Sequence, residues 1–222
     1  MKKRRRKMVY QYILFDLDGT IINSAEGIIK CVKYALKSFG IDETDDERIK
    51  PFIGPPLVWS FQEFYHFSLE DAKKATEKYR ERYRAKGIYE FELYEGITEV
   101  FKTLKEEGKT LALATSKPEV FAKQIMDKAG LSSYLDVITG SEMDGKRDNK
   151  EEVLEESFRR LNMPDKKEVI MIGDRKFDII GAKAWNIDSI GVTYGFAPEG
   201  ELEEYGATYI VHSPMEIRKI VR

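Results

Sequence analysis

Short apolar runs alternate with longer amphipathic segments along most of the chain. Apolar runs bounded by turn residues are typical of strands buried in a parallel sheet, and the amphipathic segments between them are typical of helices that cover it. The predicted strands are Tyr10–Phe15, Thr110–Ala114, Val137–Thr139, Val169–Ile172, Ser189–Val192 and Thr208–Val211. The predicted helices are Ile97–Glu107, Glu119–Ala129, Lys150–Leu161, Phe177–Trp185 and Pro214–Val221. This order predicts an α/β fold with a mostly parallel sheet sandwiched by helices.

One stretch breaks the alternation, because residues 24–91 are predicted to form successive helices with no strand. These helices are Ala25–Phe39, Asp45–Lys50, Leu57–His66 and Leu69–Lys86. A single crossover between parallel strands needs far fewer residues, so we expect an inserted helical domain at 24–91. The α/β core is then discontinuous and comprises 8–23 and 92–222.

Composition excludes several classes of protein and of site. With 222 residues, of which 42% are hydrophobic, the chain can bury a full core. Cys31 is the single cysteine, and His66 and His212 are the only histidines, so neither an internal disulfide nor a Cys/His zinc site can form. A metal site built from oxygen ligands stays possible.

Charge is distributed unevenly. Lys2–Lys7 supplies six of the 37 basic residues, which leaves 31 against 39 acidic residues in the rest of the chain. This acidic balance disfavours a nucleic-acid surface, and we expect residues 1–7 to form a disordered basic tail rather than a nucleic-acid-binding arm. Met8 is also a plausible natural start of the chain.

The apolar stretch after this tail is too short for a signal peptide or a membrane span, because it stops at Asp16 and Asp18. We therefore expect a cytoplasmic protein with no membrane partner. The sequence favours no particular oligomeric state.

Paired acidic residues follow the first predicted strand directly, at Asp16 and Asp18. Residues i and i+2 of an extended segment point the same way, so both carboxylates should face one small volume. Two carboxylates this close are tolerated when a cation lies between them, when one is protonated, or when both are well solvated. Gly19 permits the sharp turn that follows, and Thr20 can fix it with its hydroxyl.

Two further strand ends carry polar residues. The strand Val169–Ile172 leads into Gly173 and Asp174, and Asp178 follows at the start of a helix. Ligands of open α/β sheets bind outside the carboxyl ends of the strands, so the two acidic pairs should converge although about 160 residues separate them. Thr115 and Ser116 follow the strand Thr110–Ala114 and precede a helix, an arrangement that can hold an anion.

Each of these signals has a structural explanation when taken alone. A strand-end acid such as Asp174 is often an N-cap, Thr115 is typical of a cap as well, and Lys150 alone is typical of a solvated side chain. Together, four acids, two hydroxyls and a lysine at the ends of neighbouring strands contribute nothing to a core. The combination therefore favours a functional site.

Four ordered segments resemble the motifs of the haloacid dehalogenase superfamily of phosphotransferases. They are Asp16–Thr20, Thr115 with Ser116, Lys150, and Gly173–Asp178. The helical insertion resembles the small α-helical cap of that family, and Gly140–Arg147 is similar to its phosphoglycolate phosphatase and 5′-nucleotidase-like branch. The resemblance spans essentially the whole chain after Met8 and implies a Rossmann-like core with an inserted cap.

The resemblance implies a Mg²⁺-dependent phosphate monoester hydrolase that acts on a small phosphorylated metabolite through an aspartyl-phosphate. Asp16 is then the nucleophile, and Asp18 first protonates the leaving oxygen and later accepts a proton from water. The side chains of Asp16 and Asp174 and the backbone carbonyl of Asp18 are expected to hold Mg²⁺.

The resemblance also implies roles for the remaining site residues. Thr115 is expected to bind a phosphoryl oxygen, and Ser116 and Gly19 are expected to lie against the substrate. Lys150 is expected to stabilise the transferring oxygens and the nucleophile. Asp178 is expected to orient the ion's ligands or Lys150.

Within the insertion, Gly54-Pro55-Pro56 predicts a rigid turn between helices, because neither proline fits a helix interior. By resemblance, Gly54 is expected to contact the substrate, although a plain interhelical turn is equally compatible with the residues. Aromatic residues nearby are spaced to form the core of the cap more readily than a pocket. They are Trp59, Phe61, Phe64, Tyr65 and Phe67.

Two alternatives remain open on the sequence. A sugar phosphomutase of the same fold would use the same residues, but Gly19-Thr20 resembles the phosphatases more closely. A phosphorylated receiver domain also combines acids, Mg²⁺, a hydroxyl and a lysine, but it has no cap and carries its acceptor aspartate in mid-chain. A phosphatase with Asp18 as its general acid fits the motifs best.

Overall fold

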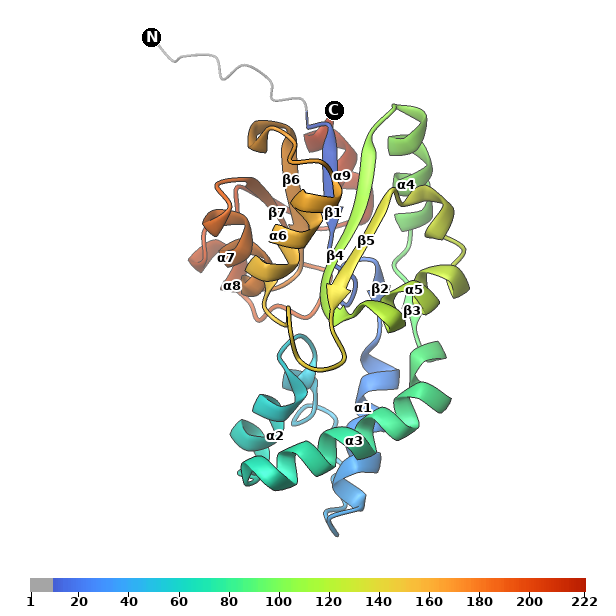
Figure 1. Cartoon of the computed structure of the whole chain (residues 1–222), viewed down its shortest axis with the longest axis vertical. Helices are drawn as coiled ribbons and strands as arrows, with labels where there is room; N and C mark the ends of the chain where they lie inside the picture. The colour runs from blue at the N-terminus through green and yellow to red at the C-terminus, as the bar shows by residue number, and fades with distance from the viewer. Residues whose placement is uncertain (1–9) are drawn as a thin grey trace. The chain divides into compact units, whose positions relative to one another are not determined.

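A computed structural model gives the fold, and it describes residues 10–222. The predicted tail at 1–7 and Met8 therefore lie outside the described residues. Close contacts divide the chain into two compact units. Among the described residues, unit 1 comprises 10–21 together with Leu93–Arg222, and unit 2 comprises Ile22–Glu92. In the first unit the two segments meet in one sheet (Figure 1).

Unit 1 is built on a six-stranded sheet with the order β5-β4-β1-β6-β7-β8. The strands are β1 (Tyr12–Phe15), β4 (Thr110–Pro118), β5 (Val137–Ser141), β6 (Val169–Gly173), β7 (Asp188–Val192) and β8 (Tyr209–Val211). Each pair of neighbouring strands is parallel. Each of the six predicted strands is present, and the α/β fold class is confirmed.

Helices lie on both faces of this sheet (Figure 1). They are α4 (Ile97–Glu106), α5 (Glu119–Lys128), α6 (Lys150–Arg160), α7 (Lys176–Ala184), α8 (Glu201–Glu204) and α9 (Pro214–Val221). Among the described residues, α8 and the 3-10 helices Ser132–Tyr134 and Lys166–Glu168 were not predicted. The five predicted helices are present with ends that differ by at most one residue.

The alternating direction of the side chains along β1 explains why helices cover both faces of the sheet. Leu14 packs in a core cluster with residues of α6 and α7, such as Phe158 and Ala182. The next residue, Phe15, has its ring 4.7 Å from that of Phe101 in α4. Successive side chains of a strand point to opposite faces, and the consecutive residues Ile13, Leu14 and Phe15 are all buried, so β1 lies between two layers of helices.

Unit 2 is helical. It contains α1 (Ala25–Lys37), α2 (Leu57–Tyr65), α3 (Leu69–Ala85) and 3-10 helices at Lys50–Phe52 and Gly87–Tyr89. The long helix α3 packs against both α1 and α2. The short strands β2 (Ile22–Asn23) and β3 (Glu92–Leu93) pair where the chain enters and leaves the unit, and they were not predicted.

The prediction of a helix at Asp45–Lys50 is wrong. This segment forms turns, in which Asp45 accepts a hydrogen bond from the backbone N–H of Glu47 at 2.9 Å, followed by the 3-10 helix Lys50–Phe52. Pro51 directly follows the predicted segment and prevents a longer α-helix across it, because proline lacks a backbone N–H and its ring clashes with the preceding turn.

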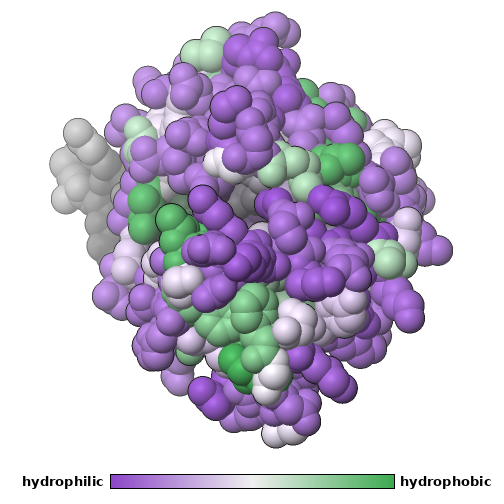
Figure 2. All heavy atoms as spheres, turned by 60° about the horizontal axis from the view of Figure 1, so that its bottom comes forward, coloured by the Kyte–Doolittle hydropathy of each residue, from purple (hydrophilic) through white to green (hydrophobic). Residues whose placement is uncertain are grey.

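The surface is largely polar on the face shown in Figure 2, where hydrophilic residues surround smaller hydrophobic areas. Among residues 10–222, none of the helices combines the length and the apolar character that crossing a membrane requires.

Candidate functional site

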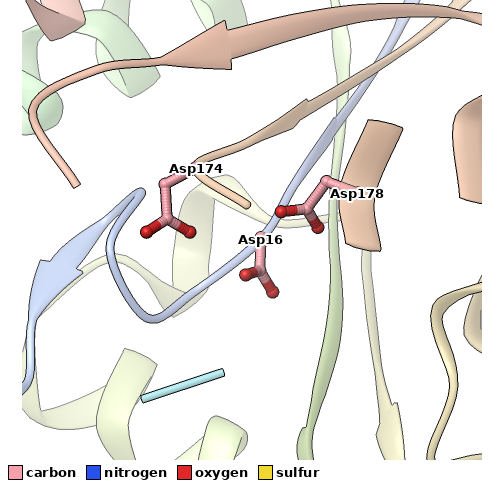
Figure 3. A group of neighbouring side chains, drawn as sticks. All are labelled: Asp16, Asp174 and Asp178. Carbon is pink, nitrogen blue, oxygen red and sulfur yellow. The ribbon is translucent and has the colours of Figure 1, made fainter. Parts of the chain in front are cut away.

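Three aspartates meet at the carboxyl ends of the central strands. Asp16 directly follows β1, Asp174 directly follows β6, and Asp178 lies in the first turn of α7. The strands β1 and β6 are neighbours in register, with Phe15 opposite Ile172. Each aspartate offers one carboxylate oxygen, and these oxygens lie within 4.8 Å of one another (Figure 3). The convergence expected of the two acidic pairs is therefore present for these residues.

Two glycines make this approach possible. Gly19 has a φ of +81°, and a Cβ atom there would lie 1.9 Å from Oδ2 of Asp174. A Cβ atom on Gly173 would lie 2.0 Å from Cγ of Asp178. No other residue fits at either position without displacing an acidic side chain. The structure thus places Gly19 against Asp174, and its predicted contact with substrate stays a prediction.

Asp174 is fully buried, and one of its oxygens lacks a protein partner. Oδ2 accepts a hydrogen bond from the backbone N–H of Phe196 at 2.7 Å. Oδ1 has no hydrogen-bond partner among the described residues. Burial raises the pKa of this carboxyl well above its usual range, and repulsion from Asp178 and Asp16 raises it further. A cation beside Oδ1 would relieve both penalties.

Asp178 holds the start of α7 and also reaches the site. Its Oδ2 accepts a hydrogen bond from the backbone N–H of Arg175 at 3.1 Å, and its Oδ1 lies 2.8 Å from Nζ of Lys150. Burial raises its pKa to about 6 even though the Lys150 ammonium opposes the shift. Asp178 is therefore a member of the acidic cluster that contacts both the start of α7 and Lys150.

Lys150 is the first residue of α6 and is almost completely buried. Its Nζ lies 2.9 Å from Oδ1 of Asp16, 2.8 Å from Asp178, and donates to the backbone carbonyl of Ala114 at 2.9 Å. Burial by itself lowers the pKa of Lys150, but the two carboxylates outweigh it and hold the pKa above its ordinary value. Lys150 is therefore a fixed positive charge beside Asp16.

Thr115 and Ser116 directly follow Ala114 and lie within β4. This strand continues to Pro118, four residues beyond its predicted end. Thr115 is buried, and its Oγ1 accepts a hydrogen bond from the backbone N–H of Lys117 at 3.2 Å. Thr115 does not cap α5, whose N-cap residue is Pro118. Both hydroxyls therefore lie at the same edge of the sheet as Asp16.

Asp18 contacts a residue to which the sequence assigned no role. Nζ of Lys117 lies 2.8 Å from Oδ1 and 2.7 Å from Oδ2 of Asp18, and both side chains are largely buried. The available signal was that Lys117 follows Thr115 and Ser116 at a strand end. Its partner could not be identified from the sequence, because 99 residues separate the two.

A second group that the sequence did not indicate supports the turn after Asp18. Tyr194 donates from its hydroxyl to the backbone carbonyl of Thr20 at 3.0 Å, and its ring lies 4.7 Å from that of Tyr94. Burial raises the pKa of both tyrosines. Together with the Phe196 N–H, this loop after β7 fixes two parts of the site.

Gly54 lies in unit 2, where it has a φ of +108° in the turn before α2. Pro56 is the N-cap residue of α2, so neither proline of this turn lies inside a helix, as predicted. Phe61 is fully buried in the unit, whereas Trp59 is 48% exposed. The predicted contact of Gly54 with substrate stays a prediction.

The donors of the site suit a small divalent cation. Carboxylate oxygens from Asp16, Asp174 and Asp178 are hard ligands and lie close together (Figure 3), and Oδ1 of Asp174 has no hydrogen-bond partner among the described residues. A cation there would compensate three negative charges, only some of which Lys150 neutralises. A carboxylate beside a fixed cation can also act as a nucleophile toward an electrophilic phosphorus.

Comparisons with known proteins agree with this chemistry. Residues 13–192 match the family model described as haloacid dehalogenase-like hydrolase. A 5′-nucleotidase of Pseudomonas aeruginosa is 40% identical over 96% of both chains. The tyrosine-protein kinase PtkA of Mycobacterium tuberculosis is 32% identical over 91% of this chain and 69% of its own length.

The same relationship is visible among solved structures. A crystal structure described as a predicted phosphatase, from Clostridium acetobutylicum, is 48% identical and superimposes with a TM-score of 0.91 over 95% of this chain and 97% of its own. The resemblance inferred from the four motifs is confirmed, and this chain belongs to the haloacid dehalogenase-like hydrolase family.

Proposed function

We propose that this protein is a Mg²⁺-dependent phosphate monoester hydrolase that acts on a small phosphorylated metabolite through an aspartyl-phosphate on Asp16. The observation that carries the proposal is the cluster of Asp16, Asp174 and Asp178 beside the buried ammonium of Lys150. The 5′-nucleotidase relative supports the reaction class and makes a nucleoside 5′-monophosphate the first substrate to test.

The metal would be held by the carboxylates of Asp16 and Asp174 and the backbone carbonyl of Asp18, with Asp178 orienting the surrounding groups. When bound, Mg²⁺ neutralises charge on the phosphoryl oxygens. The unpartnered Oδ1 of Asp174 supports this assignment, because a buried carboxylate oxygen without a hydrogen bond is costly unless an ion or water contacts it.

In the first step a carboxylate oxygen of Asp16 attacks phosphorus, and the bond from phosphorus to the leaving alcohol breaks. Asp18 gives its proton to that alcohol oxygen. Lys150 lies 2.9 Å from Asp16, so its charge fixes the nucleophile and stabilises negative charge on the transferring group. Thr115 donates a hydrogen bond to a phosphoryl oxygen.

In the second step water attacks the aspartyl-phosphate and gives a proton to Asp18. Inorganic phosphate leaves, and the Asp16 carboxylate is restored. Lys117 contacts both oxygens of Asp18, so its ammonium would orient the general acid-base group.

The test measures hydrolysis of p-nitrophenyl phosphate by the wild type and by Asp16→Asn, each with Mg²⁺ and with excess EDTA. Asparagine is nearly isosteric but cannot form the acyl-phosphate, so the folded variant should lose turnover. Asp127→Asn is the matched control, because Asp127 is exposed on α5 outside the cluster.

Turnover that needs Mg²⁺ and disappears only in Asp16→Asn supports the proposal. Turnover that survives in Asp16→Asn contradicts it, and stable phosphorylation of Asp16 without release of phosphate moves the function toward a phosphomutase or a phosphorylation switch. A panel of nucleoside monophosphates, phosphoglycolate, sugar phosphates and phosphotyrosine then identifies the substrate.

A further inference from the structure

The segment between β5 and α6 contains residues that the reaction above does not use. It runs from Glu142 to Asn149 and ends directly before Lys150. We propose that Arg147 is a positioning residue for Lys150, because it fastens this segment to the ends of β5 and α5 and to α6. The inference rests on the proposed function, in which Lys150 stabilises the transferring phosphoryl group.

The position of Lys150 depends on where α6 begins. Its ammonium makes three contacts of 2.8–2.9 Å, to Asp16, Asp178 and the Ala114 carbonyl, while the residue is only 6% exposed. Asn149 caps the helix by accepting a hydrogen bond from the backbone N–H of Glu152 at 2.9 Å. Displacement of a catalytic group by about 1 Å can cost on the order of 100-fold in rate. The segment before the cap must therefore be held firmly.

Arg147 provides contacts that hold it. Its Nε donates to the backbone carbonyl of Gly140 at 2.9 Å, and its guanidinium lies 3.7 Å from Glu119, 3.5 Å from Glu142 and 3.9 Å from Glu156. Only 18% of the side chain is exposed. Three acidic groups from three parts of the unit thus face one arginine two residues before the cap of α6.

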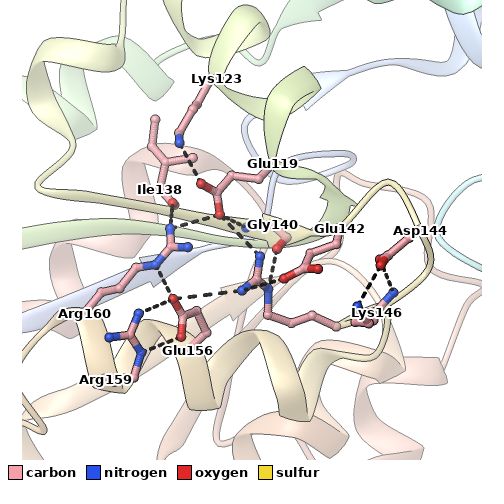
Figure 4. A network of polar contacts seen from close by, with 11 residues as sticks. Glu119, Lys123, Ile138, Gly140, Glu142, Asp144, Lys146, Glu156, Arg159 and Arg160 are labelled. Atoms are coloured by element: carbon pink, nitrogen blue, oxygen red, sulfur yellow. Dashed lines mark hydrogen bonds and ion pairs between the residues drawn. The ribbon is translucent and has the colours of Figure 1, made fainter.

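Arg160 orders two of these acidic groups from the other side. It lies 2.9 Å from Glu119 and 2.6 Å from Glu156, and it donates to the backbone carbonyl of Ile138 at 2.6 Å (Figure 4). Lys123 also pairs with Glu119, at 2.6 Å. Two of the three carboxylates that Arg147 contacts, those of Glu119 and Glu156, are therefore also held by residues outside the segment.

The location of Glu119 connects this network to the catalytic edge of the sheet. Glu119 is the first residue of α5 and directly follows β4, whose end carries Thr115, Ser116 and Lys117. The backbone N–H of Gly140 in β5 contacts Glu119 at 3.4 Å. The network thus joins the ends of β4 and β5 to the start of the helix that carries Lys150.

The backbone of Arg147 is in the left-handed region. Its φ is +56°, which is sterically unfavourable for a residue with a Cβ atom. Strained residues of this kind persist where surrounding contacts determine the conformation. For Arg147, these contacts are its ion pairs with Glu119, Glu142 and Glu156.

The test is a double-mutant cycle with Arg147→Met and Lys150→Met, using kcat/KM for p-nitrophenyl phosphate at saturating Mg²⁺. We expect Arg147→Met to lose about 10- to 100-fold, because displacement of a catalytic group by up to about 1 Å costs up to about 100-fold in rate. Because Arg147 acts through Lys150, adding Arg147→Met to Lys150→Met should cause no further loss. Arg159→Met is the matched control. Arg159 lies on α6, the helix that begins with Lys150, and it pairs with Glu156, but its side chain is 70% exposed.

Arg147→Lys should recover part of the activity, because it keeps the charge but not the forked geometry. Wild-type turnover in Arg147→Met, or losses that multiply in the double variant, would overturn the inference. Wild-type turnover in Lys150→Met would instead contradict the proposed function of Lys150. If Arg147→Met does not fold, the same cycle with Arg147→Lys and with Glu119→Gln decides between coupled and independent losses.

Discussion

At the scale of single residues, the main feature of the site is the negative charge of three aspartates, two of which contact the ammonium group of Lys150. Asp174 and Asp178 are buried, and burial raises the pKa of both carboxyls. Lys150 offsets part of this charge through its contacts with Asp16 and Asp178 but has no contact with Asp174 among those described. The remaining negative charge is what a divalent cation would compensate.

Substitution of Asp18 tests its role as a general acid. In Asp18→Asn we expect kcat/KM for an alkyl phosphate to fall by about 10²- to 10⁴-fold, because the alkoxide leaves without a proton. The loss for p-nitrophenyl phosphate should be much smaller, since nitrophenolate needs no protonation. Steady-state kinetics with both esters measure the difference, and equal losses would show that Asp18 does not protonate the leaving group.

At the scale of elements, ionic contacts on α6 join this helix to its neighbours. Glu156 accepts from Arg159 and Arg160, three and four residues further along the same helix. Arg160 in turn reaches β5 through the Ile138 carbonyl and α5 through Glu119. The helix that carries Lys150 is therefore held at both its start and its end.

The acid sensitivity of this network is a test at the same scale. Hydrogen bonds from Arg159 and then Arg160, opposed by burial, lower the pKa of Glu156 to about 2. The folded state therefore binds this proton less tightly than the unfolded chain does, so the contribution of Glu156 to stability is present above about pH 4.5 and is lost as the pH falls toward 2.

Urea unfolding at pH 7 and at pH 3 measures this contribution. We expect the free energy of unfolding to fall less between the two pH values in Glu156→Gln than in the wild type. Glu155→Gln is the control, because Glu155 is an exposed neighbour on α6. Identical losses in the wild type and in Glu156→Gln would contradict the assignment.

At the scale of the whole molecule, the buried acidic residues of the site destabilise unit 1, which contains them. Unit 1 buries hydrophobic side chains on both faces of its sheet, and this burial stabilises the fold. The same fold forces Asp174 into a fully buried position beside two other acids. Stability and metal binding should therefore change in opposite directions when this charge is removed.

Thermal unfolding of Asp174→Asn, with and without Mg²⁺, measures these two changes. In EDTA the variant should melt above the wild type, because it lacks the buried charge while its side-chain oxygen can still accept from Phe196. With Mg²⁺ at about 100 times its Kd, the wild type should gain about 2.7 kcal/mol, or about 5–10 °C in Tm. The variant should gain much less. Equal gains in both proteins would show that Asp174 does not bind the metal.

The sequence by itself determined the strands and the residues at their ends. Short apolar runs, the turn residues that bound them and their order along the chain identify the six strands of unit 1, and they place Asp16 and Asp174 directly after two of them. These patterns are local, so they are readable without knowledge of the partners of each strand. The helix expected at Asp45–Lys50 is absent, and Pro51 directly after it leaves only six residues for the helix, which are too few for a stable one.

Only the tertiary structure decided which of these ends meet and what each side chain contacts. The strand order places β1 between β4 and β6, which brings Asp16, Asp174 and the segment after Thr115 to one edge. The pair Lys117–Asp18 and the contacts of Arg147 with α5 and α6 join residues from separate elements. No periodic pattern encodes such contacts, since they depend on the packing of the strands and helices that carry the charges.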